Sequence, residues 1–258
     1  MLAYLLICIT ALAASALTFF SGFGLGTILM PVFALYFPPQ TAVALTAVVH
    51  FLNNLFKLGL VAKHTNRAVL WRFGLPSVFA ALLGAWLLMQ LSQLPELYAY
   101  QIGQKQYHVS SVKFIMALVI IIFCLFELIP ALANKSFDVR YLPLGGLLSG
   151  FFGGLSGNQG ALRSAFLMRA GLSKESFIAT GVVVACLVDI SRLSIYATSW
   201  QQQLNADNIQ LMGAATLCAF FGAWLGNRLL KKVTITFFKY LVALALVMFA
   251  LALALGLL

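Results

Sequence analysis

Charged residues inside apolar stretches are the first candidates for chemistry in this sequence. Asp189 and Arg192 lie well inside the apolar segment 175–198, three residues apart and hence on one helix face. A charge within a membrane-spanning helix costs at least ~2.5 kcal/mol on insertion scales, so it usually faces a cavity or an opposite charge. Two arrangements fit the pair. Either the side chains only neutralise each other, or Arg192 meets an anion while Asp189 orients it or carries a coupling proton.

Arg163 is a second candidate because it follows a glycine-rich interruption by three residues, at the expected start of a half-helix. A helix N-terminus carries roughly half a positive charge and several N–H groups without partners. An arginine beside it makes a compact anion site, bidentate where the anion's oxygens allow. The alternative is an arginine near a helix end whose side chain extends to the interface.

Polar residues at a similar spacing occur in the apolar segment 40–61. Asn54 and Lys57 are three residues apart, and His50 lies one helical turn before Asn54. Asn54 and Lys57 are candidate substrate contacts, although Lys57 lies near enough to its helix end to extend to the interface. His50 fits a proton site at physiological pH, or a histidine whose hydrogen bonds are satisfied inside the bundle.

Glycine interrupts two long apolar segments, 2–36 at Ser21 to Gly26 and 141–170 at Gly153 to Gly160. Irregular backbone at membrane depth survives only where it is buried in protein or lines a wet cavity. We therefore predict two helix–break–helix elements. The candidate substrate contacts in the breaks are Gly22, Gly24, Gly26, Asn158 and Gln159. The alternative is that the glycines only allow close helix packing.

The composition requires lipid as the solvent. Of 258 residues, 62% are hydrophobic and 9% are charged, whereas a soluble domain carries about 25% charged residues. Apolar segments long enough for spanning helices occur at 40–61, 69–91, 112–132, 175–198, 208–230 and 235–257. They are predicted to be helices, because lipid-exposed backbone must bond within its own segment. The connection 92–111 is predicted to be a long polar and aromatic loop.

The two halves of the chain repeat. The sequence Gly84-Ala85-Trp86-Leu87 recurs as Gly222-Ala223-Trp224-Leu225, an offset of 138 (224 minus 86). Asn54-x-x-Lys57 corresponds to Asp189-x-x-Arg192 at an offset of 135. Ser21-Gly22 matches Ser156-Gly157 at that same offset. Loop 61–72 is basic, whereas its equivalent in the second half, 199–208, is not. In the next pair of loops the asymmetry is reversed, because 91–97 is not basic and 228–232 is. Under the positive-inside rule, equivalent loops then face opposite sides. We predict inverted repeats, residues 1–132 and 133–258, each with one re-entrant broken element and three spanning helices.

The pattern Gly22-x-Gly24-x-Gly26, followed by Pro31 and by Pro38 before a helix, resembles the sulfite exporter TauE/SafE family of membrane permeases. The second break, the basic loop and the length fit as well, so the likeness covers essentially the whole chain. It implies export or uptake of small sulfur-containing anions, such as sulfite or organosulfonates, across a bacterial cytoplasmic membrane. The chain departs from the usual pattern at 157–160 and 163–165, which favours anion transport in general over any particular anion.

The sequence therefore predicts a multi-pass secondary transporter for a small anion, bound between the repeats at the breaks. Whether Asp189 or His50 couples transport to protons stays open. An anion channel or a membrane subunit of a larger complex is the alternative. An enzyme is not expected, because HExxH is absent and Glu127 and Asp189 lie in different halves.

The expected partners are the anionic substrate and the lipid bilayer. No cofactor or metal is expected, since the four cysteines lie in apolar stretches without CxxC spacing. The net charge of +10 is assigned to cytoplasmic loops rather than to nucleic-acid binding. A homo-oligomer is neither favoured nor excluded.

Overall fold

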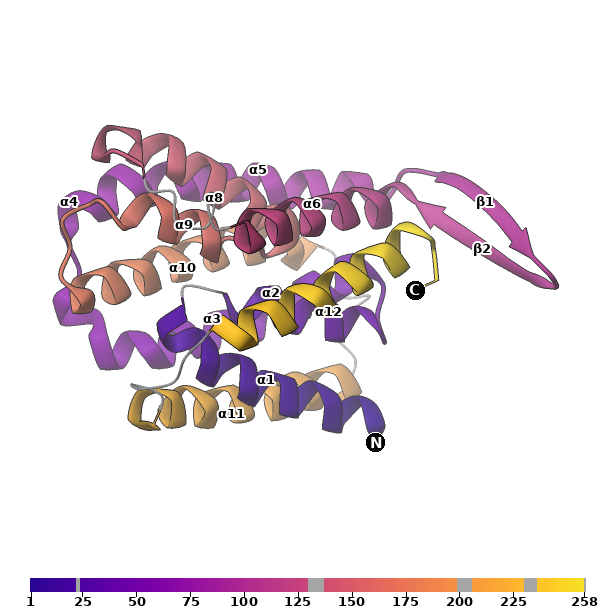
Figure 1. Cartoon of the computed structure of the whole chain (residues 1–258), viewed down its shortest axis with the longest axis horizontal. Helices are drawn as coiled ribbons and strands as arrows, with labels where there is room; N and C mark the ends of the chain where they lie inside the picture. The colour runs from indigo at the N-terminus through magenta and orange to yellow at the C-terminus, as the bar shows by residue number, and fades with distance from the viewer. Residues whose placement is uncertain (22–23, 130–136, 199–205, 230–235, 258) are drawn as a thin grey trace.

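A computed structural model describes residues 1–21, 24–129, 137–198, 206–229 and 236–257 of the chain. These residues form an elongated helical bundle (Figure 1). Within them, four helices are long and apolar enough to cross a membrane, at Pro39–Gly59, Arg67–Leu91, Lys174–Tyr196 and Asp207–Gly226. The predicted all-α membrane fold is confirmed.

The helices follow the predicted order along the chain. The first half contains α1 (Leu2–Ser21), α2 (Leu25–Ala34), α3 (Pro39–Val61), α4 (Arg67–Val69), α5 (Leu75–Leu91) and α6 (Ser111–Leu128). The second contains α8 (Leu142–Ser156), α9 (Gly160–Leu167), α10 (Lys174–Tyr196), α11 (Ala206–Leu229) and α12 (Thr236–Ala254). A π-helical turn, Leu70–Gly74, joins α4 to α5. Each of the six predicted spanning segments overlaps one of these helices, although α5 begins six residues after the predicted start of 69–91. Four of the segments match the helices long enough to span, whereas α6 and α12 fall in the group of shorter apolar helices.

Both predicted breaks separate two helices, and both are shorter than expected. Helix α2 already begins at Leu25, so Gly26 is helical. Helix α8 continues through Ser156, so the second break covers residues 157–159 rather than 153–160. It begins at Gly157, whose φ of 80° is the left-handed conformation that favours glycine at a helix C-terminus. Gly153 and Gly154 are helical, and close packing accounts for Gly154. Gly22, a predicted substrate contact, lies outside the described residues.

The connection after α5 contains a β-hairpin, so the prediction of a long loop was wrong here. Strand β1 (Glu96–Ile102) pairs antiparallel with β2 (Lys105–Ser110), and Figure 1 shows the hairpin projecting from one end of the bundle. The turn between them has two residues and includes Gly103 at φ 61°. A two-residue glycine turn between aromatic-rich stretches is a hairpin signal, which the sequence contained.

Helix ends reproduce the repeat found in the sequence. Helix α1 ends at Ser21 and α8 ends at Ser156, an offset of 135 (156 minus 21). Helix α2 begins at Leu25 and α9 begins at Gly160, at the same offset. Both ends of α3 (Pro39–Val61) and α10 (Lys174–Tyr196) are also 135 residues apart. Helix α10 begins beside the turn that follows α3, where Asn66 N donates a 3.0 Å hydrogen bond to Thr180 Oγ1. The two matched helices therefore run in opposite directions.

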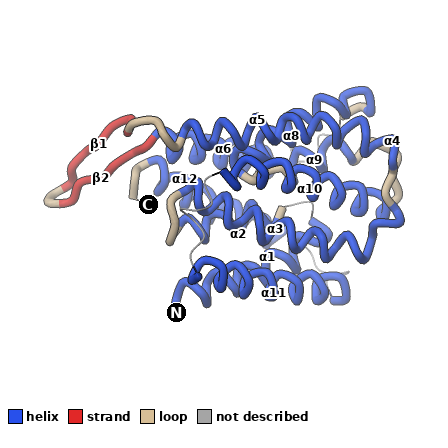
Figure 2. The backbone as a smooth tube through the Cα atoms, turned by 180° about the vertical axis from the view of Figure 1, so that it is seen from behind, coloured by secondary structure: helices blue, strands red, loops and turns tan. Residues whose placement is uncertain are grey.

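The opening helix of each half packs on a helix of the other half. Helix α1 lies along α11, and α8 lies along α5 (Figure 2). Helices α3 and α10 contact each other between these pairs, as α6 and α12 do. Neither half can therefore bury its opening helix without the other.

Glycines bring α8 and α5 into backbone contact. Gly146, Gly150 and Gly154 recur every four residues and so share one face of α8. A Cβ added at Gly150 would lie 2.1 Å from the carbonyl oxygen of Ser77. On the matching pair, a Cβ at Gly222 would lie 2.2 Å from the carbonyl oxygen of Leu12. Small residues at such interfaces allow the close van der Waals packing that holds helices together in lipid.

The contact of α8 with α5 predicts a large difference between two glycine substitutions. Gly150→Ala should destabilise the protein by about 1–3 kcal/mol or more, because the methyl group meets backbone. Gly213→Ala should leave stability unchanged or raise it by up to ~1 kcal/mol, because Gly213 in α11 has no neighbour within 4 Å of the new methyl group. Thermal unfolding of the purified proteins in detergent measures both. Equal stability of the two variants would contradict this packing.

Candidate functional site

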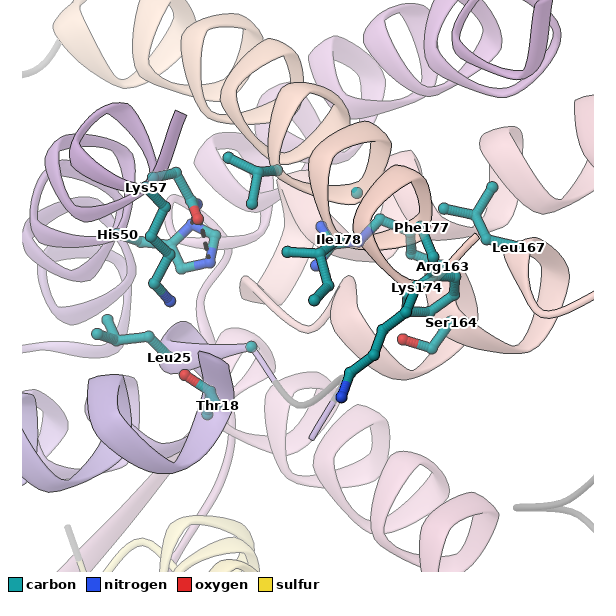
Figure 3. A pocket seen from close by; sticks show the side chains of 14 residues that line it. Thr18, Leu25, His50, Lys57, Arg163, Ser164, Leu167, Lys174, Phe177 and Ile178 are labelled. Atoms are coloured by element: carbon teal, nitrogen blue, oxygen red, sulfur yellow. Dashed lines mark hydrogen bonds between the residues drawn. The ribbon is translucent and has the colours of Figure 1, made fainter. Parts of the chain in front are cut away.

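A cavity of about 240 Å³ lies among α1, α2, α3, α9 and α10. It is lined by Thr18, Gly24, Leu25, His50, Asn54, Lys57, Arg163, Ser164, Leu167, Lys174, Phe177, Ile178, Gly181 and Val182. Figure 3 shows Lys57 and His50 on one side and Arg163 and Lys174 on the other. We call this space the basic cavity. Both halves of the chain contribute to it.

Three cationic side chains line the basic cavity, and its lining contains no carboxylate among the described residues. Lys57 is buried, Arg163 is half-buried and Lys174 is exposed, so the positive charge extends from the interior to the surface. Arg163 Nη1 lies 3.4 Å from Gln159 Oε1. Lys57 Nζ lies 3.3 Å from the Asn53 amide oxygen, in the amide orientation that best satisfies its neighbours. The amide groups of Gln159 and Asn53 are neutral, so these two contacts leave the positive charges of Arg163 and Lys57 in place.

The N-terminus of α2 also faces the basic cavity. Gly24 precedes the helix in an extended conformation and supplies no side-chain cap. Gly24 and Leu25 both line the cavity. The first N–H groups of a helix have no partner within it and carry the positive end of the helix dipole. This end of α2 therefore adds to the positive potential of the three side chains.

His50, Asp189 and Arg192 form a buried charged cluster that joins α3 to α10. Asp189 Oδ2 lies 2.6 Å from His50 Nδ1, and Asp189 Oδ1 accepts from Arg192 Nη2 at 2.7 Å and from Nε at 3.0 Å. Asn54 Nδ2 donates to Asp189 Oδ2 at 3.4 Å. Asp189 and Arg192 are fully buried. In a low-dielectric interior such groups are stable only when paired and hydrogen-bonded.

The same cluster stabilises the C-terminal end of α8. Arg192 Nη1 donates to the carbonyl oxygen of Gly153 at 3.4 Å, and the Tyr196 hydroxyl donates to that of Gly154. The last carbonyl groups of a helix lack partners within it, and a cation near them is favourable. Arg192 therefore joins α10 to the second break as well as to Asp189.

The two breaks meet beside this cluster. A Cβ at Gly26 would lie 3.3 Å from the carbonyl oxygen of Gly157 and 3.9 Å from His50 Cδ2. A Cβ at Gly157 would lie 3.1 Å from Arg192 Nη1. His50 is 11 residues from either end of α3 (61 minus 50, 50 minus 39), which is roughly 16 Å along a helix. The breaks therefore lie near the middle of the spanning helix α3.

The structure separates the predicted site residues into two groups. Arg163, Lys57, Asn54, His50 and Gly24 line the basic cavity. Asp189, Arg192, Gln159, Asn158 and Gly26 do not, but they lie in or beside the breaks. Asn158 instead lines a small space with Thr27 and Cys124.

Several lining residues were not singled out from the sequence, and Lys174 matters most among them. Lys174 directly precedes the predicted spanning segment 175–198, so its charge was visible in the sequence. Ser173 begins α10 directly before it, accepting a 3.2 Å hydrogen bond from Ser176 N. Serine at this position is a common start signal for a helix. Lys174 and Arg163 line the same cavity, and only six residues separate the end of α9 from the start of α10.

A helical membrane bundle with a charged cavity beside paired, interrupted helices is a recurrent plan of membrane transporters. The family model described as Sulfite exporter TauE/SafE matches residues 7–253, nearly the whole chain. The chain therefore belongs to the sulfite exporter TauE/SafE family, as the glycine pattern suggested. It is an integral membrane transporter and not an enzyme. No curated protein shows significant similarity to it.

The charged cluster predicts strong energetic coupling between Asp189 and Arg192. Asp189→Asn and Arg192→Met should each destabilise the protein by about 3–5 kcal/mol, because each leaves a buried charge without its partner. The double variant should lose less than the sum, with a coupling of about 0.5–3 kcal/mol. Unfolding in detergent measures this cycle, with Arg169→Met as the control at an exposed arginine. Additive losses would show that the two side chains do not act together.

Proposed function

We propose that this transporter carries small sulfur-containing anions, such as sulfite or organosulfonates, across a bacterial cytoplasmic membrane. The observation that supports this proposal most strongly is the basic cavity. Lys57, Arg163 and Lys174 line it together, and the described lining residues include no carboxylate. Such an arrangement raises the local concentration of anions and repels cations. The family supports sulfur-containing anions as the class.

Each side of the basic cavity has a role in the proposal. Arg163 offers the planar, bidentate donors that match an oxyanion, and Lys57 supplies a second cation from the opposite wall. Asn54 adds an amide donor. The apolar side chains of Leu25, Phe177 and Ile178 would contact the organic part of a sulfonate.

We place Asp189 and Arg192 in a supporting role while the basic cavity holds the anion. Arg192 already donates to Asp189 and to the carbonyl oxygen of Gly153. Asp189 in turn orients His50 and Asn54, which line the cavity. The cluster thus positions cavity residues and neutralises its own charges.

The proposal includes the inverted repeat, with residues 1–132 and 133–258 as the two repeats. Its support is the common offset of helix ends and the opposite directions of α3 and α10. Transport would then proceed by movement of one repeat against the other around the central breaks. Because Lys63, Arg67 and Arg72 lie in and beside the turn at which α10 begins, the basic cavity would face the cytoplasm.

Transport in proteoliposomes tests the basic cavity. Arg163→Ala should raise KM for the transported anion roughly 10- to 100-fold, the cost of a lost charge-assisted hydrogen bond. Radiolabelled sulfite, sulfate and ethanesulfonate are the probes. Arg169→Ala is the matched control, because it removes the same charge from an exposed residue that does not line the cavity.

Two results would contradict this proposal. If none of the three anions moves through folded wild-type protein, the substrate class is wrong. If Arg163→Ala transports like the control, Arg163 does not bind the anion. Flux that fails to saturate would instead favour the alternative of an anion channel.

Proton coupling is the second part of the proposal, and it rests on the contact of His50 with Asp189. His50 lines the basic cavity and faces Asp189 and Arg192 of α10 and Arg163 of α9. A histidine in such a place can exchange a proton with the cavity while its carboxylate partner stays buried.

His50→Gln should remove the effect of a pH gradient on transport, because glutamine keeps hydrogen bonding but cannot titrate. Anion flux is measured with and without an imposed gradient, and Arg163→Ala serves as the comparison. That variant should slow flux under both conditions. If His50→Gln retains the full response to the gradient, His50 does not carry the coupling proton.

A further inference from the structure

The repeat predicts where the basic cavity should have a counterpart. Adding the offset of 135 to lining residues of the first half leads from Gly24 to Gln159, from Asn54 to Asp189 and from Lys57 to Arg192. Subtracting it from lining residues of the second half leads from Phe177 to Ala42 and from Gly181 to Thr46. These counterpart positions lie on the N-terminal half of α3, the C-terminal half of α10 and the second break, whereas Arg163 leads to the apolar Ile28 of α2.

These counterpart positions lie together in the structure but are closed. Arg192, Gln159 and Ala42 are fully buried and Thr46 nearly so. A Cβ at Gly26 would lie 3.7 Å from Thr46 Cγ2 and 3.3 Å from the carbonyl oxygen of Gly157. Gly157 in turn lies against Arg192. The contact of the two breaks thus joins Thr46 to Arg192.

Two polar atoms in this closed region have no hydrogen-bond partner among the described residues. They are Thr46 Oγ1 and Gln159 Nε2, both at counterpart positions; Asn158 Oδ1 of the same break and Thr18 Oγ1 of the basic cavity are also buried without such a partner. A buried polar group without a partner is costly, so it needs an explanation. Gln159 Oε1 faces Arg163 of the basic cavity, while its Nε2 remains unpaired. The positions found from the repeat and the unpaired atoms found from the structure are independent observations that coincide.

We propose that Thr46, Gln159 and Arg192 form a second oxyanion site, the outer half-site, which opens to the side of the membrane opposite the basic cavity. The hydroxyl of Thr46 and the amide of Gln159 donate to the anion there, and Arg192 supplies the charge that Lys57 supplies in the basic cavity. Gln159, between Arg163 and Arg192, passes the anion from one to the other. This inference deepens the proposed transport function and rests on it.

Sidedness of thiol labelling tests the outer half-site. The four native cysteines are first replaced by serine. Ser164→Cys then reports on the basic cavity and Ala42→Cys on the outer half-site, each with a small change in volume. In oriented vesicles, an impermeant anionic methanethiosulfonate should modify Ser164→Cys from the cytoplasmic face and Ala42→Cys from the outer face.

Labelling and transport are measured on the same preparations, so that two failures can be distinguished. If the vesicles transport the anion but Ala42→Cys stays unmodified from outside, or reacts from the cytoplasmic face instead, the outer half-site is wrong and the basic cavity stands. If wild-type vesicles transport none of the three anions, the proposed function itself fails.

Substitution of Thr46 separates a transport role from a structural one. Thr46→Val keeps side-chain volume and removes an unpaired group, so unfolding in detergent should show equal or higher stability. Transport should nevertheless fall roughly tenfold or more. Thr216→Val is the matched control, because Thr216 Oγ1 is likewise buried and unpaired but lies on α11. Transport equal to that of the control would overturn the proposal.

Discussion

The rest of this structure depends on the buried contact of Asp189 with His50 and Arg192. It holds the central helices α3 and α10 together through the carboxylate, and it reaches α8 through the carbonyl oxygen of Gly153. Water cannot replace these bonds in a dry interior, so each charge depends on its partner. The cluster consequently determines where the second break lies relative to α3.

The cationic side chains divide into two kinds because of this cluster. Arg192 is fully buried and bonded to a carboxylate, whereas Arg163 and Lys57 contact neutral amides beside an open cavity. A buried charge that loses its partner is strongly destabilising, so the bond to Asp189 holds Arg192 in this closed arrangement. Arg163 and Lys57 instead line a cavity whose positive potential attracts an anion. Cations on matched helices can thus be held differently in one arrangement of the bundle, depending on the partners that the fold supplies.

Close helix packing is the second constraint, and it makes the halves depend on each other. The face of α8 formed by Gly146, Gly150 and Gly154 meets the backbone of α5 and the turn before it, while Gly222 meets α1. In lipid, the association of helices relies on such van der Waals contact rather than on a hydrophobic effect. The central helices of both halves are thereby held where their polar residues meet, and the basic cavity forms between them.

The sequence by itself determined the membrane class, the order of the helices, the places of the two breaks and the 135-residue offset, because hydrophobic length and glycine are local signals. It also identified the polar residues that belong at the centre. It missed the hairpin at 96–110, although its two-residue turn is local too. Only the tertiary structure decided that Arg163 faces the cavity while Arg192 turns to Asp189, and that Lys174 joins the lining. Those assignments depend on which helices become neighbours, and spacing along one helix carries no information about the partner that another helix supplies.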